Sequence, residues 1–511
     1  MGNETNKIMR SVGEEYLFCE ANEDFLLPDY MPEIRRVLSL ESVLSPDEPI
    51  LRTGGADFEG RLLYKLLYTD ESGVLTEALL EGHYRTSLDR EEDALLLSPY
   101  ERIESVSFRP VGPRKLSIRA KIRICPDARA IHKDLPSMRD LTCETESEIE
   151  LLPAETAVLS VYSAVSAPLE AEFTVRPEGV EVEDLRLTAS HGDLLVEGAT
   201  ATEGKISLYG TLFAQAVMAQ PTGESTVIAK RLPFEAELCA AEAKAGDAVT
   251  AYGLFDGMDI SCEGEGSSAD LVISLRYRVR ATGRRNDTLP YVADLYAVDK
   301  ATTLSRKETK LQSLLGVAMG TVSVDGETAI EPEEEGEVLL STLTVRESHL
   351  RPFGDKVIIE GEMRGELIVK TESGHLCEPL TFPFRIEAAP GAPCDEKDLF
   401  RYTLHPSCAV GSISGGRRRI NGEVGYTVTV LRHTTVALPE SLAFSERAKP
   451  DTSELRIYYP KPQDSLFSVG KTFALPLKKL AALNDIPLPN EKETHLPKTL
   501  DGYAWLFVSD F

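Results

Sequence analysis

The stretch GRLLYKLLY at residues 60–68, followed by the turn DESG at 70–73, decides the fold of this chain. A short apolar run that ends in a glycine-containing turn is typical of one arm of an antiparallel hairpin, because glycine tolerates the positive φ of such turns. Two later stretches repeat the pattern: residues 204–213 with a turn at 221–223, and residues 365–370 with a turn at 372–374. The turn glycines at 73, 223 and 374 are spaced by 150 and 151 residues.

A second strand pattern recurs with almost the same period. Its three copies, which largely alternate apolar and polar side chains, are residues 116–124, 271–279 and 420–430. Aligned on Ile122, Tyr277 and Tyr426, they are spaced by 155 and 149 residues. Each stretch alone is an ordinary half-buried strand. Two patterns that recur together three times predict an internal triplication, and a period this long indicates repeated whole domains.

The 511 residues are too many for one ordinary hydrophobic core, and long helical periodicity is scarce. We therefore predict a mainly β fold, with three tandem antiparallel, sandwich-like β domains followed by a small strand–helix–helix–strand domain. The predicted division is an N-terminal segment at 1–40, β repeats at 41–175, 176–300 and 339–448, a linker at 301–338, and a C-terminal domain at 453–511. The linker is predicted from the acidic run 331–337, where like charges and proline disfavour a packed core.

The segment LPDYMPEIRRVL at residues 27–38 differs from these strand patterns. Pro32 suits the first turn of a helix, and Ile34, Val37 and Leu38 have the spacing of one helical face. We predict a short amphipathic helix that packs on the first β domain. Docking on a neighbouring subunit is the alternative.

The C-terminal segment changes from strand patterns to helical ones. Four elements are predicted in order: a strand at 455–459, a helix over 466–473, a second helix over 477–484 and a closing strand at 503–508. Asp464 is expected to cap the first helix, and Pro476 opens the second.

These elements resemble a LysM module. The resemblance is carried by Tyr458, Pro462, residues 464–469, Phe473, Leu477, Leu480, Leu483 and Asn484. LysM modules commonly bind the N-acetylglucosamine backbone of peptidoglycan or chitin through the loop after the first strand and the loop after the second helix. The resemblance therefore implies a glycan-binding or partner-binding surface at Gln463, Asp464, Ser465, Asn484, Asp485 and Ile486.

The order of the segments extends the resemblance to nearly the whole chain. The Pro-Asp motif at residues 28–38, the three β repeats and the LysM-like end resemble the SPOCS-domain plus LysM spore-coat morphogenesis proteins of clostridial endospore formers. The resemblance implies SPOCS-type repeats that scaffold coat assembly, and a LysM domain that binds the coat's morphogenetic ATPase. It also implies a place in the mother-cell cytoplasm, at the forespore surface or in the spore coat.

The charge balance argues against nucleic acid as a partner. The chain has 55 Lys and Arg against 83 Asp and Glu, a net charge of −28, which repels phosphate backbones. No apolar run approaches the roughly 20 residues of a membrane span. The first residues also lack the charged-then-apolar layout of a secretion signal. We predict a cytoplasmic protein with no transmembrane segment and no nucleic-acid partner.

No catalytic constellation is evident in the sequence. The stretch GSISG at residues 411–415 has Ile413 where a nucleophile elbow needs serine, and no His-Glu-x-x-His motif is present. We predict a non-catalytic scaffold with no cofactor and no metal site. The residues predicted to face its partner are Lys461, Gln463, Asp464, Phe467, Lys471, Lys478 and Lys479. The alternatives are a peptidoglycan-binding LysM wall protein and a hydrolase whose site lies within the β domains.

Overall fold

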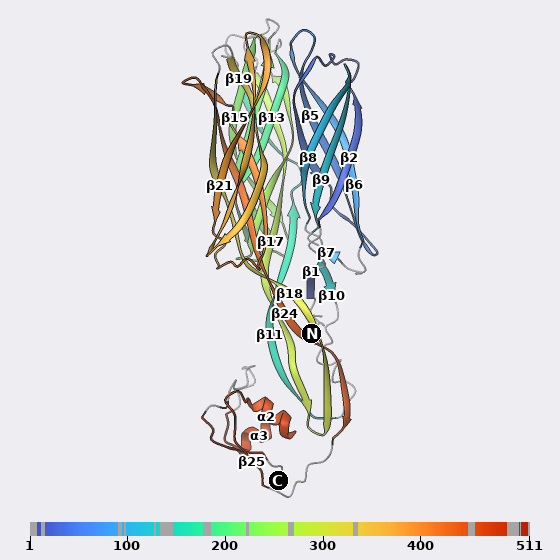
Figure 1. Cartoon of the computed structure of the whole chain (residues 1–511), viewed down its shortest axis with the longest axis vertical. Coiled ribbons are helices and arrows are strands. Elements are labelled where there is room, and N and C mark those ends of the chain that lie inside the picture. The colour runs from blue at the N-terminus through green and yellow to red at the C-terminus, as the bar shows by residue number, and fades with distance from the viewer. Residues whose placement is uncertain are drawn as a thin grey trace.

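In the computed structural model, the chain consists almost entirely of antiparallel β-sheets (Figure 1). The structure describes residues 8–11, 16–89, 95–96, 99–126, 129–132, 147–176, 185–220, 224–263, 270–330, 336–447, 455–487, 500 and 502–508. Within these residues the only helices are two short ones near the C-terminus. The prediction of a mainly β fold is confirmed.

Six of the sheets form three pairs with the same connectivity. In each pair, three successive long strands form a meander, and the facing sheet has its last strand in the centre. Pair 1 combines the meander β3 (Arg36–Pro46), β5 (Gly55–Thr69) and β6 (Leu75–Asp89), with β4 (Ile50–Arg52) beside β5, and the sheet β2 (Leu17–Leu26), β9 (Lys115–Cys125) and β8 (Tyr100–Gly112). The meander of pair 2 consists of β13 (Arg186–Thr202), β14 (Lys205–Ala219) and β15 (Ser225–Cys239). In its facing sheet, the central strand is β17 (Asp270–Ala297), and it pairs with β11 (Ile149–Val165), β12 (Leu169–Val175) and β16 (Ala248–Glu263). The meander of pair 3 consists of β19 (Gly336–Phe353), β20 (Lys356–Thr371) and β21 (Gly374–Ala388). In its facing sheet, the central strand is β24 (Arg417–Glu446), and it pairs with β18 (Lys300–Ala329), β22 (Leu399–Cys408) and β23 (Ser412–Ser414).

The two sequence patterns fall on the central strands of these sheets. The first pattern falls on β5, β14 and β20, and the second falls on β9, β17 and β24. A central strand is hydrogen-bonded along both edges and turns one face to the core, so its side chains alternate between apolar and polar. In β9, for example, Leu116, Ile118 and Ile122 are buried, and their cluster includes residues of the facing meander. A core of this kind lies within each of the three pairs.

The predicted linker at 301–338 is wrong for the described part of that range. β18 occupies most of it and pairs with β24 from one end to the other. The polar side chains of β18 are largely exposed. Its backbone hydrogen bonds to β24 keep this segment ordered although it buries few apolar side chains. Residues 331–335 of the acidic run lie outside the described residues.

Strand pairing also displaces the predicted repeat boundaries. β11 and β12 fall in the first predicted repeat, at 41–175, but they pair with β17. β2 falls in the predicted N-terminal segment, at 1–40, but it pairs with β9. These partners are about a hundred residues apart or more, and a local pattern does not encode them. A short three-stranded sheet of β1 (Ile8–Ser11), β10 (Arg129–His132) and β7 (Leu95–Leu96) completes this part of the chain.

The predicted helix at 27–38 is also wrong. The described residues there form an irregular segment that leads into β3. The N–H of Leu27 donates to the carbonyl of Arg114 at 2.8 Å, and the N–H of Ile34 donates to the turn between β8 and β9 at 2.7 Å. These long-range hydrogen bonds take the place of the helical ones that the sequence predicts. Ile34 packs against the core of pair 1.

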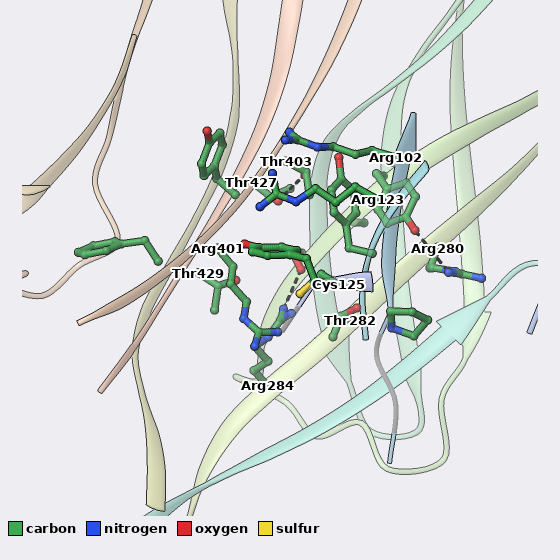
Figure 2. A pocket seen from close by; sticks show the side chains of 18 residues that line it. Arg102, Arg123, Cys125, Arg280, Thr282, Arg284, Arg401, Thr403, Thr427 and Thr429 are labelled. Atoms are coloured by element: carbon green, nitrogen blue, oxygen red, sulfur yellow. Dashed lines mark hydrogen bonds between the residues drawn. The ribbon is translucent and has the colours of Figure 1, made fainter. Parts of the chain in front are cut away.

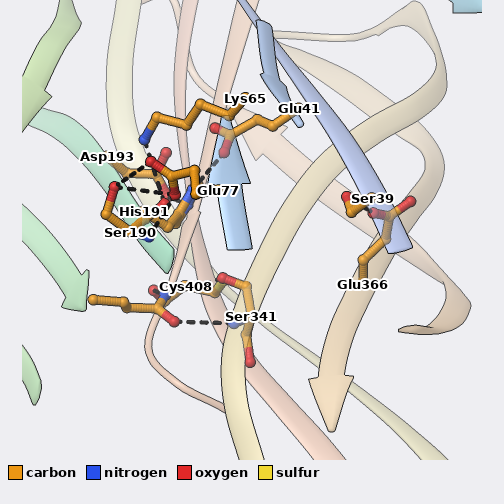
Figure 3. A network of polar contacts seen from close by, with 11 residues as sticks. Ser39, Glu41, Lys65, Glu77, Ser190, His191, Asp193, Ser341, Glu366 and Cys408 are labelled. Atoms are coloured by element: carbon orange, nitrogen blue, oxygen red, sulfur yellow. Dashed lines mark hydrogen bonds and ion pairs between the residues drawn. The ribbon is translucent and has the colours of Figure 1, made fainter. Parts of the chain in front are cut away.

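An apolar cluster joins the three pairs, and so do several polar contacts, which Figure 3 shows. The cluster contains Leu67 and Leu75 from pair 1, Ala189 and Val217 from pair 2, and Leu339, Leu340 and Ile368 from pair 3. Next to it, the side chain of Gln215 in β14 is hydrogen-bonded to the backbone of Ser341 in β19 and of Cys408 in β22. The pairs are therefore held by buried contacts and not by flexible connections alone.

A buried group of charges joins pair 1 to pair 2. His191 Nδ1 lies 3.2 Å from a carboxylate oxygen of Glu41 in β3, and His191 Nε2 lies 2.9 Å from Asp193. Burial alone lowers the pKa of His191, but the charges and hydrogen bonds of Asp193 and Glu41 outweigh burial and raise the pKa to about 10. Burial raises the pKa of Glu41, whereas the charges of His191 and Lys65 lower it to about 2. His191 is therefore a cation at neutral pH.

We expect this junction to contribute most to stability between about pH 4.5 and pH 6.5, the ordinary pKa values of the two groups. Because the pKa of His191 is raised on folding, its contribution is full below pH 6.5 and is lost as the pH rises through about 10. Because the pKa of Glu41 is lowered, its contribution is full above pH 4.5 and is lost as the pH falls through about 2.

The measurement compares the wild type with His191→Gln in guanidinium chloride unfolding at about pH 6 and about pH 9.5. The difference in unfolding free energy should shrink markedly at the higher pH. A difference that stays constant between the two pH values would show that His191 carries no charge in the folded protein.

Two long strand ribbons extend beyond the sheet pairs. In Figure 1, β11, β18 and β24 run from the body toward the end that carries the helices. A second apolar cluster, formed by Val158, Leu289, Leu311, Val436 and Leu438, joins the β11–β17 ribbon to the β18–β24 ribbon. The ribbons thus form a stem between the body and the C-terminal residues.

Candidate partner-binding site in the C-terminal unit

The described residues from 455 onward form a small unit, here called the C-terminal unit. β25 (Ile457–Tyr458) pairs with β26 (Leu506–Phe507), and α2 (Leu466–Phe473) and α3 (Leu477–Leu483) lie between these strands in the sequence. The elements and their order agree with the sequence prediction. The N-cap of α2 differs from the prediction, because it is Ser465 and not Asp464. Ser465 and Ser468 exchange side-chain-to-backbone hydrogen bonds of 3.1 and 2.9 Å.

The C-terminal unit packs on the stem through an aromatic contact. Phe467 of α2 is only 3% exposed, and its ring meets that of Tyr296 in β17 edge-on, with centroids 5.2 Å apart. The hydroxyl of Tyr296 donates to the carbonyl of Leu475 at 2.7 Å. Gly470 lies so close that an added Cβ would be 2.4 Å from this hydroxyl. The fit therefore requires glycine at that position of α2.

Polar contacts surround the same joint. Lys471 Nζ lies 2.5 Å from a carboxylate oxygen of Asp294 in β17. The first N–H of α3, from Leu477, donates to the carboxylate of Glu150 in β11 at 2.8 Å. Pro476 precedes α3 and provides no side-chain cap, so Glu150 supplies the negative group that stabilises the start of this helix.

Two residues predicted to face a partner therefore have internal roles. Phe467 belongs to the core between α2 and the stem, and Lys471 is paired with Asp294. The apolar positions of α2 cover more than one face of the helix, because the helix packs on its own unit and on the stem. The sequence of the segment alone does not show the second of these surfaces.

The first predicted glycan loop is also held by internal bonds. The carboxylate of Asp464 accepts the hydroxyl proton of Tyr458 at 2.6 Å and the N–H of Lys461 at 2.7 Å. The bond from the Lys461 N–H, together with that from Tyr458, lowers the pKa of Asp464. Ser465 is the helix cap, which leaves Gln463 as the exposed member of this loop.

The second predicted loop closes the small sheet. The side-chain amide of Asn484 donates to the carbonyls of Leu480 and Phe507 at 2.8 and 3.0 Å and accepts the N–H of Phe507 at 2.6 Å. Ile486 is buried in the core of the unit, whereas Asp485 is exposed. Asn484 thus fixes β26 against the end of α3 and has no amide atom left for a ligand.

The remaining predicted residues lie at the surface. Lys461 and Lys478 are exposed, and Lys479 is half-buried. Residues 455–487 contain five cationic and two acidic side chains, whereas the whole chain has a net charge of −28. The unit is therefore locally basic, as the sequence predicts.

An apolar surface on the outer side of β25 and β26 was not predicted from the sequence. Leu455, Ile457, Tyr459 and Trp505 are between 46% and 69% exposed. Ile457 pairs with Phe507, and the rings of Trp505 and Phe507 are 4.7 Å apart. We call these five residues the outer face. Two features of the sequence indicate this surface. Residues 455, 457, 458 and 459 are all apolar, whereas a strand with one buried face needs an apolar residue only at every second position. Trp505 is also the only tryptophan of the chain.

The outer face has the composition of a protein-binding surface. Exposed tryptophan and tyrosine side chains are typical of the centre of protein interfaces. No group of three or more His, Cys, Asp or Glu side chains within the described ranges could hold a metal ion. None of the helices in the described ranges is both long and apolar enough to cross a membrane. Comparison of the chain with protein-family models, with curated proteins and with solved structures gives no match.

Proposed function

We propose that this protein is a non-catalytic scaffold in endospore coat assembly, and that its C-terminal unit binds the coat's morphogenetic ATPase. The observation that carries the proposal is the exposed aromatic outer face on a locally basic unit at the end of a long stem. The resemblance of the sequence to the SPOCS-domain plus LysM proteins supplies the partner. In this proposal the three sheet pairs are SPOCS-type domains, the C-terminal unit is a LysM-type domain, and the protein works in the mother-cell cytoplasm at the forespore surface.

The chemistry of the surface favours a protein partner. Tyrosine and tryptophan lose little conformational entropy on binding and bury a large area, so they often dominate interface energies. Lys461 and Lys478 add positive charge, which favours an acidic surface and speeds association. The rigidly joined body presents further surfaces on the same chain, and several modest contacts raise the overall affinity for a coat layer that contains other coat proteins.

Peptidoglycan binding is the second candidate, because Tyr459 and Trp505 also offer flat apolar surfaces to a ligand. The polar loop residues support it less. Asp464, Ser465 and Asn484 are used for internal hydrogen bonds, and Ile486 is buried. Gln463 and Asp485 are the members of the two loops that remain exposed.

We expect the double variant Tyr459→Ser with Trp505→Ala to bind the ATPase at least about thirtyfold more weakly than the wild type. This is the loss for a hot spot worth about 2 kcal/mol. Biolayer interferometry with the purified ATPase and the full chain measures the affinity. The thermal unfolding midpoint should not change, because both side chains are exposed in the folded protein.

The matched control is Tyr30→Ser, which removes an exposed tyrosine far from the C-terminal unit in sequence and should leave the affinity unchanged. Equal ATPase binding by the double variant and the wild type would refute the outer face as the binding surface. Sedimentation with purified peptidoglycan that is lost in the double variant, with ATPase binding unaffected, would assign the surface to the glycan.

A further inference from the structure

A pocket lies where one sheet from each of the three pairs meets the other two (Figure 2). Its volume is about 170 Å³, which is room for several water molecules or a small ligand. Side chains reach it from β8 and β9 of pair 1, from β16 and β17 of pair 2, and from β22 and β24 of pair 3. The pocket therefore exists only when the three pairs are assembled.

The lining of this pocket is strongly cationic. It contains Arg102, Arg123, Arg280, Arg284 and Arg401, and it contains no aspartate or glutamate. Within the described residues, Arg102, Arg123 and Arg280 have no carboxylate within ion-pair distance. Three guanidinium groups without a described carboxylate partner in one cavity, here Arg102, Arg123 and Arg280, are energetically costly unless an anion offsets their charge.

Arg280 is the best-placed group for such an anion. It is 8% exposed, and its Nε has no hydrogen-bond partner within the described residues. Its Nη1 is 3.5 Å from the hydroxyl of Tyr252, which is a weak contact. The carboxyl group of Glu101 interacts electrostatically with Arg280 but is not within ion-pair distance of it. Burial raises the pKa of Glu101 to about 7, and the carboxyl group accepts a hydrogen bond from Tyr84. Arg280 thus keeps unused hydrogen-bonding capacity in a buried position.

The rest of the lining supports the same chemistry. The guanidinium group of Arg123 lies 3.6 Å from the centre of the Tyr16 ring, and this contact orients its N–H donors. The Nε of Arg123 has no hydrogen-bond partner among the described residues. Thr250 accepts a hydrogen bond from Arg284 at 2.8 Å, and Thr403 and Thr427 are 2.7 Å apart. One guanidinium group can donate two parallel hydrogen bonds to a phosphate group, and threonine hydroxyls add further donors.

We propose that this junction pocket binds a small anion with at least two negative charges, namely a phosphate group that is free or carried by a small organic molecule. The anion would contact guanidinium groups from all three sheet pairs, so it would stabilise their assembly by mass action. Tyr100 and Tyr252, whose rings are 6.1 Å apart, provide an apolar wall for the organic part of an ester.

The first test is calorimetric titration of the full chain with inorganic phosphate and with phenyl phosphate, at constant ionic strength. We expect saturable binding with one site per chain, and a thermal midpoint that rises with ligand concentration. Tighter binding of phenyl phosphate would assign the ligand to organic phosphates, and equal binding would assign it to free phosphate. An absence of saturable binding of either probe up to about 10 mM would overturn the proposal.

The second test uses substitutions of the lining. Arg280→Gln should weaken binding at least about tenfold, the usual loss for hydrogen bonds to a charged group. If this variant does not fold, Arg102→Gln decides, because Arg102 is exposed and its loss should weaken binding severalfold without affecting the core. The control is Arg119→Gln, which removes an exposed arginine on β9 that is hydrogen-bonded to Asn22 outside the pocket. An effect of Arg119→Gln equal to that of the lining variants would show that the anion binds nonspecifically and overturn the proposal.

Discussion

We expect Gln215→Leu to destabilise the protein by about 3 kcal/mol or more, because it removes three hydrogen bonds to buried backbone groups of two neighbouring strands. Gln215 is 1% exposed. Its Nε2 donates to the carbonyls of Ser341 and Cys408, and its Oε1 accepts the N–H of Ser341, all at 3.0 Å. β19 is the edge strand of its sheet, so alternate residues direct their N–H and C=O groups away from the sheet. Gln215 satisfies those of Ser341 from the neighbouring pair.

Guanidinium chloride unfolding of the full chain measures this effect as a lower midpoint. Leucine has a similar length and fills the space, so the loss comes from unpaired polar groups and not from a cavity. Gln463→Leu is the control, since Gln463 is exposed and its replacement should change the midpoint little. An unchanged midpoint for Gln215→Leu would mean that water replaces the amide at the junction, and that the pairs are joined by apolar contacts alone.

The central strands are the part of the fold that the sequence predicts well. The patterns around Tyr64, Ile122 and Tyr277 combine short apolar runs, alternation and glycine turns, and each of these is a local property. The predicted helix near Ile34 and the predicted linker from residue 301 failed for the same physical reason. Their partners, the turn between β8 and β9 and the strand β24, are far away in the sequence. Long-range hydrogen bonds decided between the local alternatives.

The candidate site shows a similar division. Helix spacing predicts α2, although the sequence predicts Asp464 as its cap where the structure has Ser465, and lysines at 461 and 478 are exposed as expected. The inward position of Phe467 depends on Tyr296, and the internal role of Asp464 depends on Tyr458. Neither contact follows from helical periodicity. The arginine pocket was beyond prediction from sequence, since its cationic residues are spread from residue 102 to residue 401 and meet only through the packing of three sheets.

The second large effect is expected for Phe467→Ala, which should release the C-terminal unit from the stem. Replacing a buried phenylalanine by alanine typically costs about 3–5 kcal/mol. The core of this unit is small, so such a loss is a large fraction of its stability. We expect the unit to become sensitive to limited proteolysis while the body keeps its unfolding midpoint, because the cores of the three pairs do not include Phe467.

The comparison with Trp505→Ala distinguishes packing from recognition in the same unit. Phe467→Ala should lose both protease resistance and ATPase binding, since an unfolded unit cannot present the outer face. Trp505→Ala should weaken binding while protease resistance is retained, because Trp505 is exposed in the folded protein. If Phe467→Ala instead kept its resistance and lost only binding, Phe467 would act at the partner surface, and its edge-on contact with Tyr296 would not hold the unit to the stem.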